Sequence, residues 1–193
     1  MKNKRYAAFI FDRFADHQLS MILACLGQGG GYELETFSTT GRTVLSASGV
    51  RVAPHTDLAN MAPEDFDLLL LPGGLQWERG DNLEIFPLIM ASAGRRPLIA
   101  IGEAILALAD LGLLDNIPHT AASSGYLERF CPEYAGARFF RPQPVVHSGT
   151  ILTVSATAFA AAGHGLLGLF DTLQKISANN HELFDPAYQT TGA

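Results

Sequence analysis

The chain has 193 residues, of which 48% are hydrophobic and 17% are charged, a composition that suits one domain with a full hydrophobic core. Its formal net charge is −6 and it has no basic cluster, which argues against nucleic acid or an anionic membrane as a partner. Glycine, proline or charged residues interrupt the apolar stretches, so no membrane span is expected, and the two cysteines, Cys25 and Cys131, fit a cytoplasmic protein without a disulfide framework.

Along the chain, short apolar runs alternate with segments of helical periodicity, a pattern typical of a parallel sheet covered by helices. The predicted strands span residues 6–11, 32–37, 68–71, 98–101 and 151–154, and residues 43–45 and 50–52 form an added hairpin. The predicted helices span residues 16–26, 83–93, 103–111 and 157–173, the third of them ending at Gly112. The fold class is therefore α/β, a flavodoxin-like, doubly wound and mostly parallel sheet with helices on both faces. Since no linker or repeat divides the chain, residues 1–175 are expected to form a single domain and residues 176–193 a polar C-terminal tail.

Three segments that follow predicted strands are expected to meet at one edge of the sheet, because the carboxyl ends of parallel strands lie together there. They are residues 12–18, the turn Pro72-Gly73-Gly74, and the pair Gly102-Glu103. The pair follows a buried strand and leads into a helix through one sharp turn, a geometry that normally presents a catalytic nucleophile. Here the turn residue is Gly102, for which we predict a positive φ, and it has no side chain to offer.

These segments, together with residues 14–16 and 108–115, resemble the ThiJ/PfpI superfamily of the class I glutamine amidotransferase-like fold over most of the chain. In that family the turn after the strand carries a nucleophilic cysteine, and a carboxylate from the loop after the first strand supports its thiol. The resemblance places Gly102 at the position of the cysteine and Gln18 at that of the carboxylate. It also makes Gly73 and Gly74 binding candidates, because an amide N–H near the second glycine helps to form the family's oxyanion hole. The two groups that a nucleophilic hydrolase needs are therefore replaced in this chain.

The remaining candidate residues each admit two interpretations. Glu103 is either a carboxylate that simply favours the N-terminus of its helix, or a general base or ligand anchor. Asp16 is either the cap of the first helix or a catalytic acid. His17 is either a polar residue at the rim of the pocket or a titrating partner of Glu103, and Gln18 is placed to donate a hydrogen bond to that carboxylate. Ser124 is equally suited to line the pocket or to cap a helix.

Other chemical signals in the sequence are weak. The six histidines are scattered without metal-ligand spacing, so we expect no metal site and no cofactor. The glycine-rich residues 27–31 follow a helix and precede a strand, the reverse of what a phosphate-binding loop needs, and are interpreted as a helix stop. Cys131 is the one thiol in range of a pocket, but nothing around it resembles a nucleophile turn.

Three functions are compatible with these residues. The first is a ThiJ/PfpI-like binding or regulatory module that has lost its nucleophile, takes a small-molecule ligand and forms a homodimer, as the resemblance implies. The second is a hydratase or lyase acting on a small substrate, with Glu103 working with Asp16 or His17 in proton transfer. The third is the intracellular protease or amidase activity that the resemblance implies, which the residues at the site do not support.

Overall fold

The computed structural model describes residues 4–27, 32–156 and 158 of the chain. Within them seven strands form one sheet in the order β5-β2-β1-β6-β7-β9-β8, in which every pair is parallel except β8 with β9. The bounds are β1 Lys4–Phe9, β2 Tyr32–Ser38, β5 Thr56–Asp57, β6 Leu68–Leu71, β7 Leu98–Ile101, β8 Val145–Ser148 and β9 Ile151–Val154. Separately, β3 (Val44–Leu45) and β4 (Arg51–Val52) form the antiparallel hairpin that the sequence predicts. The predicted mostly parallel, flavodoxin-like sheet is confirmed.

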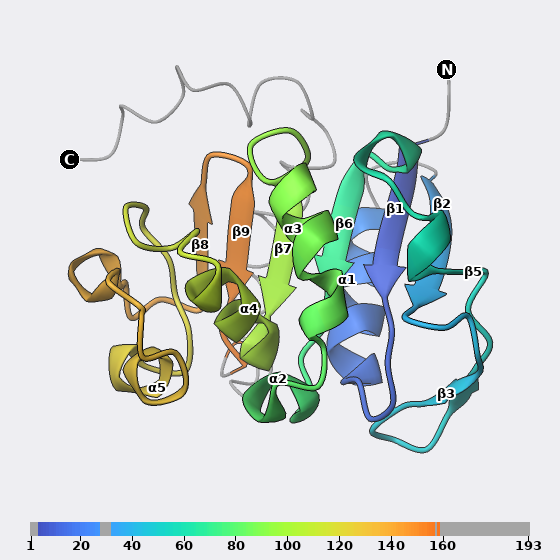
Figure 1. Cartoon of the computed structure of the whole chain (residues 1–193), viewed down its shortest axis with the longest axis horizontal. Helices are drawn as coiled ribbons and strands as arrows, with labels where there is room; N and C mark the ends of the chain where they lie inside the picture. The colour runs from blue at the N-terminus through green and yellow to red at the C-terminus, as the bar shows by residue number, and fades with distance from the viewer. Residues whose placement is uncertain (1–3, 28–31, 157, 159–193) are drawn as a thin grey trace.

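Helices lie on both faces of the sheet, with α1 behind β1 and β6 and with α3 and α4 in front of the sheet in the view of Figure 1. The α-helices are α1 Asp16–Gly27, α2 Gln76–Arg79, α3 Phe86–Ser92, α4 Ile105–Asp110 and α5 Ser124–Phe130. The 3₁₀ turns are η1 Leu58–Asn60, η2 Pro63–Asp65, η3 Leu83–Ile85, η4 Gly102–Ala104 and η5 Ala137–Phe139. Two predicted helices therefore begin as 3₁₀ turns, η3 before α3 and η4 before α4, a tightening that is common at helix ends.

The structure contains elements that the sequence pattern did not predict, namely α2, α5, β5 and β8. Each is seven residues or shorter, too short to show a clear period. The strand β8 pairs with β9 across a turn in which Gly149 has a φ of +57°, a conformation suited to a tight hairpin. The predicted helix at 157–173, apart from Ala158, and the tail at 176–193 lie outside the described residues.

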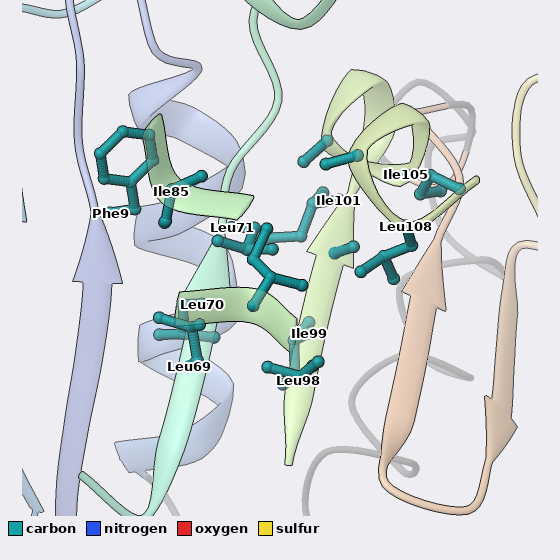
Figure 2. Close-up of a cluster of buried hydrophobic side chains, with 14 of the residues drawn as sticks. Phe9, Leu69, Leu70, Leu71, Ile85, Leu98, Ile99, Ile101, Ile105 and Leu108 are labelled. Atoms are coloured by element: carbon teal, nitrogen blue, oxygen red, sulfur yellow. The ribbon is translucent and has the colours of Figure 1, made fainter. Parts of the chain in front are cut away.

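The core is centred on the two strands β6 and β7, all of whose residues are buried. Figure 2 shows side chains of these strands packed against Phe9 of β1, Ile85 of η3, and Ile105 and Leu108 of α4. Because helices cover both faces of these strands, apolar residues are required at every position and not only at alternate ones. The uninterrupted runs of leucine and isoleucine in the sequence therefore correspond to the middle of the sheet.

The end of α4 is fixed by a local backbone signal. Gly112 has a φ of +68°, its N–H donates to the carbonyl of Ala109 at 3.0 Å, and the N–H of Leu113 donates to the carbonyl of Leu108 at 2.9 Å. This pair of hydrogen bonds is a Schellman motif, which requires the left-handed conformation that glycine adopts without a Cβ penalty. The predicted role of Gly112 is confirmed.

The segment that follows α4 is anchored by a fully buried histidine, His119. Its Nδ1–H donates to the carbonyl of Ile117 at 2.7 Å, and the hydroxyl of Tyr134 donates to its Nε2 at 2.6 Å. Since the carbonyl of Ile117 requires a hydrogen on Nδ1, Nε2 of the neutral imidazole is the acceptor that receives the Tyr134 hydroxyl. Burial, together with the nearby Arg141 guanidinium, lowers the pKa of His119 below 6.5.

We predict that replacing Leu70 by aspartate lowers the free energy of unfolding by about 4 kcal/mol or more, because an unpaired carboxylate would be buried between two strands. Leu83→Asp is the matched control, since Leu83 is 54% exposed and the same substitution there should change stability by less than about 1 kcal/mol. Urea unfolding of both variants measures the difference. Equal midpoints for the two variants would show that β6 is not central.

We also predict that the free energy of unfolding decreases as the pH falls through about 6.5. In this range the unfolded chain binds a proton at residue 119, whereas the folded protein does not, because its His119 pKa is lower. The contribution is complete above that pH and is lost progressively toward the folded-state pKa. Urea midpoints between pH 8 and pH 5 measure the slope. The slope should become smaller in His119→Gln. The slope that remains in this variant comes from His147, because burial lowers its pKa as well. An unchanged slope in that variant would exclude His119 as the cause.

Candidate functional site

The three segments expected to converge do so at the carboxyl ends of β1, β6 and β7, the edge at the bottom of Figure 1 near which α2 lies. The N–H of Gly73 donates to Oε1 of Gln18 at 2.9 Å, and the N–H of Gly74 donates to Oε2 of Glu103 at 3.0 Å. In addition, the N–H of Ala15 donates to the carbonyl of Gly73 at 2.8 Å. The glycine turn after β6 is therefore held by one side chain from α1 and one from η4.

Glycine is required at position 73 because two side chains approach its backbone closely. A Cβ built there would overlap Oε2 of Glu103 and would lie 2.6 Å from Oε1 of Gln18 and 3.1 Å from the carbonyl oxygen of Ile101. The first two of these atoms accept hydrogen bonds from the turn, so neither is free to move away without losing its partner. The hydrogen bonds thus hold the two side chains so close to the turn that only glycine fits at position 73.

Gly102 has a φ of +57°, as predicted, and it occupies the sharp turn between β7 and α4. A Cβ at this position would lie 3.1 Å from Nε2 of Gln18 and 3.5 Å from the Cβ of Ala156. A side chain introduced at 102 would therefore point at the amide group of Gln18. The turn keeps a geometry that presents a side chain to the site, but the residue present has none.

Glu103 lies in the first turn of the helical segment and is partly exposed. Its carboxylate does not simply benefit from the helix N-terminus, because it accepts the N–H of Gly74 from the neighbouring loop. The expected hydrogen bond from Gln18 to Glu103 is not among those of the described residues, in which each of the two side chains accepts from a different glycine. That expectation is wrong because Oε1 of Gln18 accepts the N–H of Gly73, which leaves the Nε2 end of the amide facing Gly102.

A cavity of about 470 Å³ opens over this turn. Its lining combines small and apolar groups with charged and amide groups, contributed by Arg13, Ala15, His17, Gln18, Ala47, Gly74, Leu75, Gln76, Arg79 and Glu103. His17 is exposed and shares the cavity with Glu103, as one of its two predicted roles requires. The volume is in the range of small-molecule binding sites.

Asp16 and Ser124 do not take the capping roles that the sequence suggested. Asp16 is the first residue of α1, but its carboxylate accepts from the N–H and the hydroxyl of Ser48, at 3.3 and 2.9 Å. Burial raises the pKa of Asp16, but hydrogen bonds from Ser48 and Ser46 outweigh it and leave the pKa below its ordinary value of 3.8. The cap of α5 is the hydroxyl of Ser123, which accepts the N–H of Tyr126 at 3.0 Å, so the predicted cap is displaced by one residue. Neither Asp16 nor Ser124 belongs to the lining of the 470 Å³ cavity.

The lining also contains Gln76 and Arg79, which lie outside the segments that the sequence indicated, and Arg13, which lies within the expected segment 12–18 but was not named as a candidate. Arg13 has a φ of +66° and is the one non-glycine residue with a positive φ among the described residues. Gln76 and Arg79 belong to α2, a single turn ended by Gly80 in the left-handed conformation. The dipeptide Arg79-Gly80 was a possible helix-end signal, but no sequence signal shows that α2 lies over the cavity.

Thiol and metal chemistry find no support at this site. The thiol of Cys131 is buried and donates to the carbonyl of Leu106 at 3.5 Å. Burial, and then the neighbouring Asp110 carboxylate, raise the pKa of the Cys131 thiol far above its ordinary value. The part of the chain that the structure describes holds no group of three or more His, Cys, Asp or Glu side chains that would hold a metal ion.

Comparison with known proteins identifies the family. The model of the DJ-1/PfpI family matches residues 4–163. The chain belongs to the DJ-1/PfpI family. It is 25% identical over 175 residues to the uncharacterized protease YoaZ of Bacillus subtilis, a match that covers 82% of this chain and 79% of that protein.

Solved structures agree with this assignment. The DJ-1 superfamily protein Atu0886 from Agrobacterium tumefaciens is 28% identical, with a TM-score of 0.75 and coverage of 92% of this chain and 99% of that one. A thiJ/pfpI family protein from Bacillus anthracis is 24% identical, has the same TM-score of 0.75 and shows the same fold, with coverage of 94% and 92%. A search of the described helices finds none with the length and apolar character needed to cross a membrane.

We predict that Gly73→Ala destabilises the protein by about 1–3 kcal/mol, because the new methyl group displaces the Gln18 and Glu103 side chains from the turn. Gly125→Ala is the matched control, since a Cβ there meets nothing within 4 Å. It should leave stability unchanged or raise it by up to about 1 kcal/mol. In a Glu103→Ala background the cost of Gly73→Ala should decrease, which a double-mutant cycle of urea unfolding energies measures. Strict additivity would show that Glu103 does not contact residue 73.

Proposed function

We propose that this DJ-1/PfpI protein is a non-hydrolytic binding or regulatory module with a small-molecule site over the Gly73-Gly74 turn. The observation that carries the proposal is the double hydrogen bond at that turn, in which Gln18 and Glu103 accept the two backbone N–H groups. The family resemblance assigns an amide N–H near the second glycine to oxyanion binding, so a side chain of the protein itself takes the place of a reacting oxygen.

The chemistry of hydrolysis sets three requirements, which are a nucleophile, a group that activates it, and donors for the developing oxyanion. Gly102 supplies no nucleophile at the turn after β7. The amide of Gln18 cannot accept the proton of a nucleophile as a carboxylate or imidazole would. The carboxylate of Glu103 binds the N–H of Gly74 and would repel a second negative oxygen there. All three requirements therefore fail at the same place.

The cavity supports binding in place of hydrolysis, because its 470 Å³ is enough for a small molecule and both arginine and glutamate side chains line it. As the family resemblance implies, we propose that the module is a homodimer that works in the cytoplasm.

A second candidate function is a hydratase or lyase in which Glu103 transfers a proton. It is favoured by the presence of His17 and Glu103 in one cavity. His17 would be the partner of Glu103, because the Asp16 carboxylate is bound to Ser48. Turnover of a bound compound that is lost in both His17→Gln and Glu103→Gln would favour this function over the module.

The test of the module uses hydrolysis and engineered thiols. We predict that the wild type and Gly102→Cys both fail to hydrolyse p-nitrophenyl acetate or a casein substrate above the buffer rate. The thiol of Gly102→Cys should also be a poor nucleophile, because the adjacent Glu103 carboxylate opposes its ionisation. Gly102→Cys/Glu103→Gln removes that charge at constant size and should show a lower thiol pKa.

The measurement is the pH dependence of iodoacetamide alkylation at residue 102, followed by mass spectrometry. Equal thiol pKa values in the single and double variants would show that Glu103 does not act on the turn. Hydrolysis by the wild type would contradict the module itself, and hydrolysis that survives Glu103→Gln and Gln18→Ala would require a catalytic group elsewhere.

A further inference from the structure

The cavity over the Gly73-Gly74 turn has charged groups of both signs, and this arrangement points to a class of ligand. We infer that the cavity binds a zwitterionic amino acid, whose carboxylate pairs with Arg13 and Arg79 and whose ammonium group meets Glu103 and Gln76. The inference rests on the proposed function, because it names the ligand class of the same binding site.

Two cations without an ion-pair partner among the described residues line the cavity. Arg13 lies in the loop after β1 and Arg79 in the last turn of α2, and both are exposed. The ion pair between Arg96 and Asp67 involves neither arginine of the cavity, and within the described part of the chain neither of their guanidinium groups donates a hydrogen bond. Two guanidinium groups from separate elements of one cavity suit a carboxylate, which accepts several hydrogen bonds from such forks.

The backbone conformation of Arg13 is a second, independent indication that its side chain has a functional role. Its φ of +66° places it in a left-handed conformation that glycine adopts easily and a long side chain does not. The conformation is held by a hydrogen bond from its N–H to the carbonyl of Leu45 at 2.6 Å. Such strain is concentrated at functional sites, so an arginine kept at this position is best explained by what its guanidinium group binds.

Glu103 supplies the negative charge of the cavity, and the neutral amide of Gln76 supplies a second acceptor. Glu103 uses Oε2 for the N–H of Gly74, which leaves its carboxylate with further acceptor capacity toward the cavity that it lines. Oε1 of Gln76 is buried and accepts no hydrogen bond within the described part of the chain, although Gln76 also lines the cavity. A buried acceptor without a donor is unfavourable, and an ammonium group carries three donors.

The combination distinguishes a zwitterion from simpler ions. A dicarboxylate would bring its second negative charge toward Glu103, and a diamine would bring its second positive charge toward the two arginines. The apolar surface of Ala15, Ala47 and Leu75 provides space for an amino-acid side chain. An amino acid therefore offers a counterpart to the two arginines, to Glu103 and to the amide of Gln76.

The experiment uses the full chain and the twenty common L-amino acids, each tested alone by thermal shift, with the dissociation constant of the tightest binder measured by calorimetry. Its N-acetyl derivative lacks the ammonium charge and its carboxamide lacks the carboxylate. We expect each derivative to bind roughly ten-fold more weakly or worse, as the loss of one charge-assisted contact implies. Absence of any shift with all twenty amino acids, or equal binding of the N-acetyl derivative, would overturn the inference.

Three variants test which residues contact the charged groups of the amino acid. Arg79→Gln and Glu103→Gln remove one charge each, and Arg13→Gly removes the guanidinium while relieving the positive φ. We expect each to weaken binding roughly ten-fold or more, whereas Arg13→Gly leaves the melting temperature of the free protein unchanged or higher. Arg95→Gln is the matched control, because Arg95 is exposed and lies outside the cavity lining, and its affinity should equal that of the wild type.

The outcomes separate this inference from the proposed function. Binding of the amino acid that is unchanged in Arg13→Gly and Arg79→Gln would overturn the assignment of the carboxylate. A protein that binds no amino acid and hydrolyses no ester or peptide would contradict the ligand class alone. A protein that hydrolyses the test substrates would contradict the non-hydrolytic module, whatever it binds.

Discussion

The arrangement of the site depends on the two backbone N–H groups of the Gly73-Gly74 turn and on the side chains that accept them. Gln18 comes from α1 on one face of the sheet and Glu103 from η4 at the end of β7, so the two hydrogen bonds join the carboxyl ends of three neighbouring strands. Parallel sheets bring such ends together, but without acceptors the turn would leave N–H groups unpaired. Buried amide groups of this kind are costly, and the side chains at 18 and 103 remove that cost.

The same two hydrogen bonds are the basis for proposing a non-hydrolytic role within this family. The fold is that of the DJ-1/PfpI family, and a relative from Bacillus subtilis is called an uncharacterized protease. A fold positions its loops, whereas the reaction depends on the groups that those loops carry. In this chain the sharp turn after β7 carries Gly102, and the adjacent N–H groups are already occupied by an amide oxygen and a carboxylate.

Gly102 and Arg13 both have a positive φ, and they differ in the strain that this conformation causes. The turn after β7, where a nucleophile would be held under strain, has a glycine whose positive φ carries no Cβ penalty. The loop after β1 has the opposite feature, because Arg13 holds a positive φ with a long, charged side chain. A residue in such a conformation persists only where its surroundings fix it, here through the N–H of Arg13 and the carbonyl of Leu45. In this site the strained non-glycine residue is therefore the arginine at the cavity, and the turn after β7 is free of such strain.

The sequence by itself determined the features that depend on local signals. Apolar runs at β6 and β7 identified the middle of a parallel sheet, and glycine at 102 and 112 marked two left-handed turns, because periodicity and backbone freedom are properties of neighbouring residues. Only the tertiary structure decided which distant side chains bind one another and which residues reach the cavity. Asp16 binds Ser48, more than thirty residues away, instead of capping its own helix, and the four-residue helix α2 brings Arg79 to the cavity. Such pairings depend on how distant segments pack at the edge of the sheet, and no pattern within one segment records that packing.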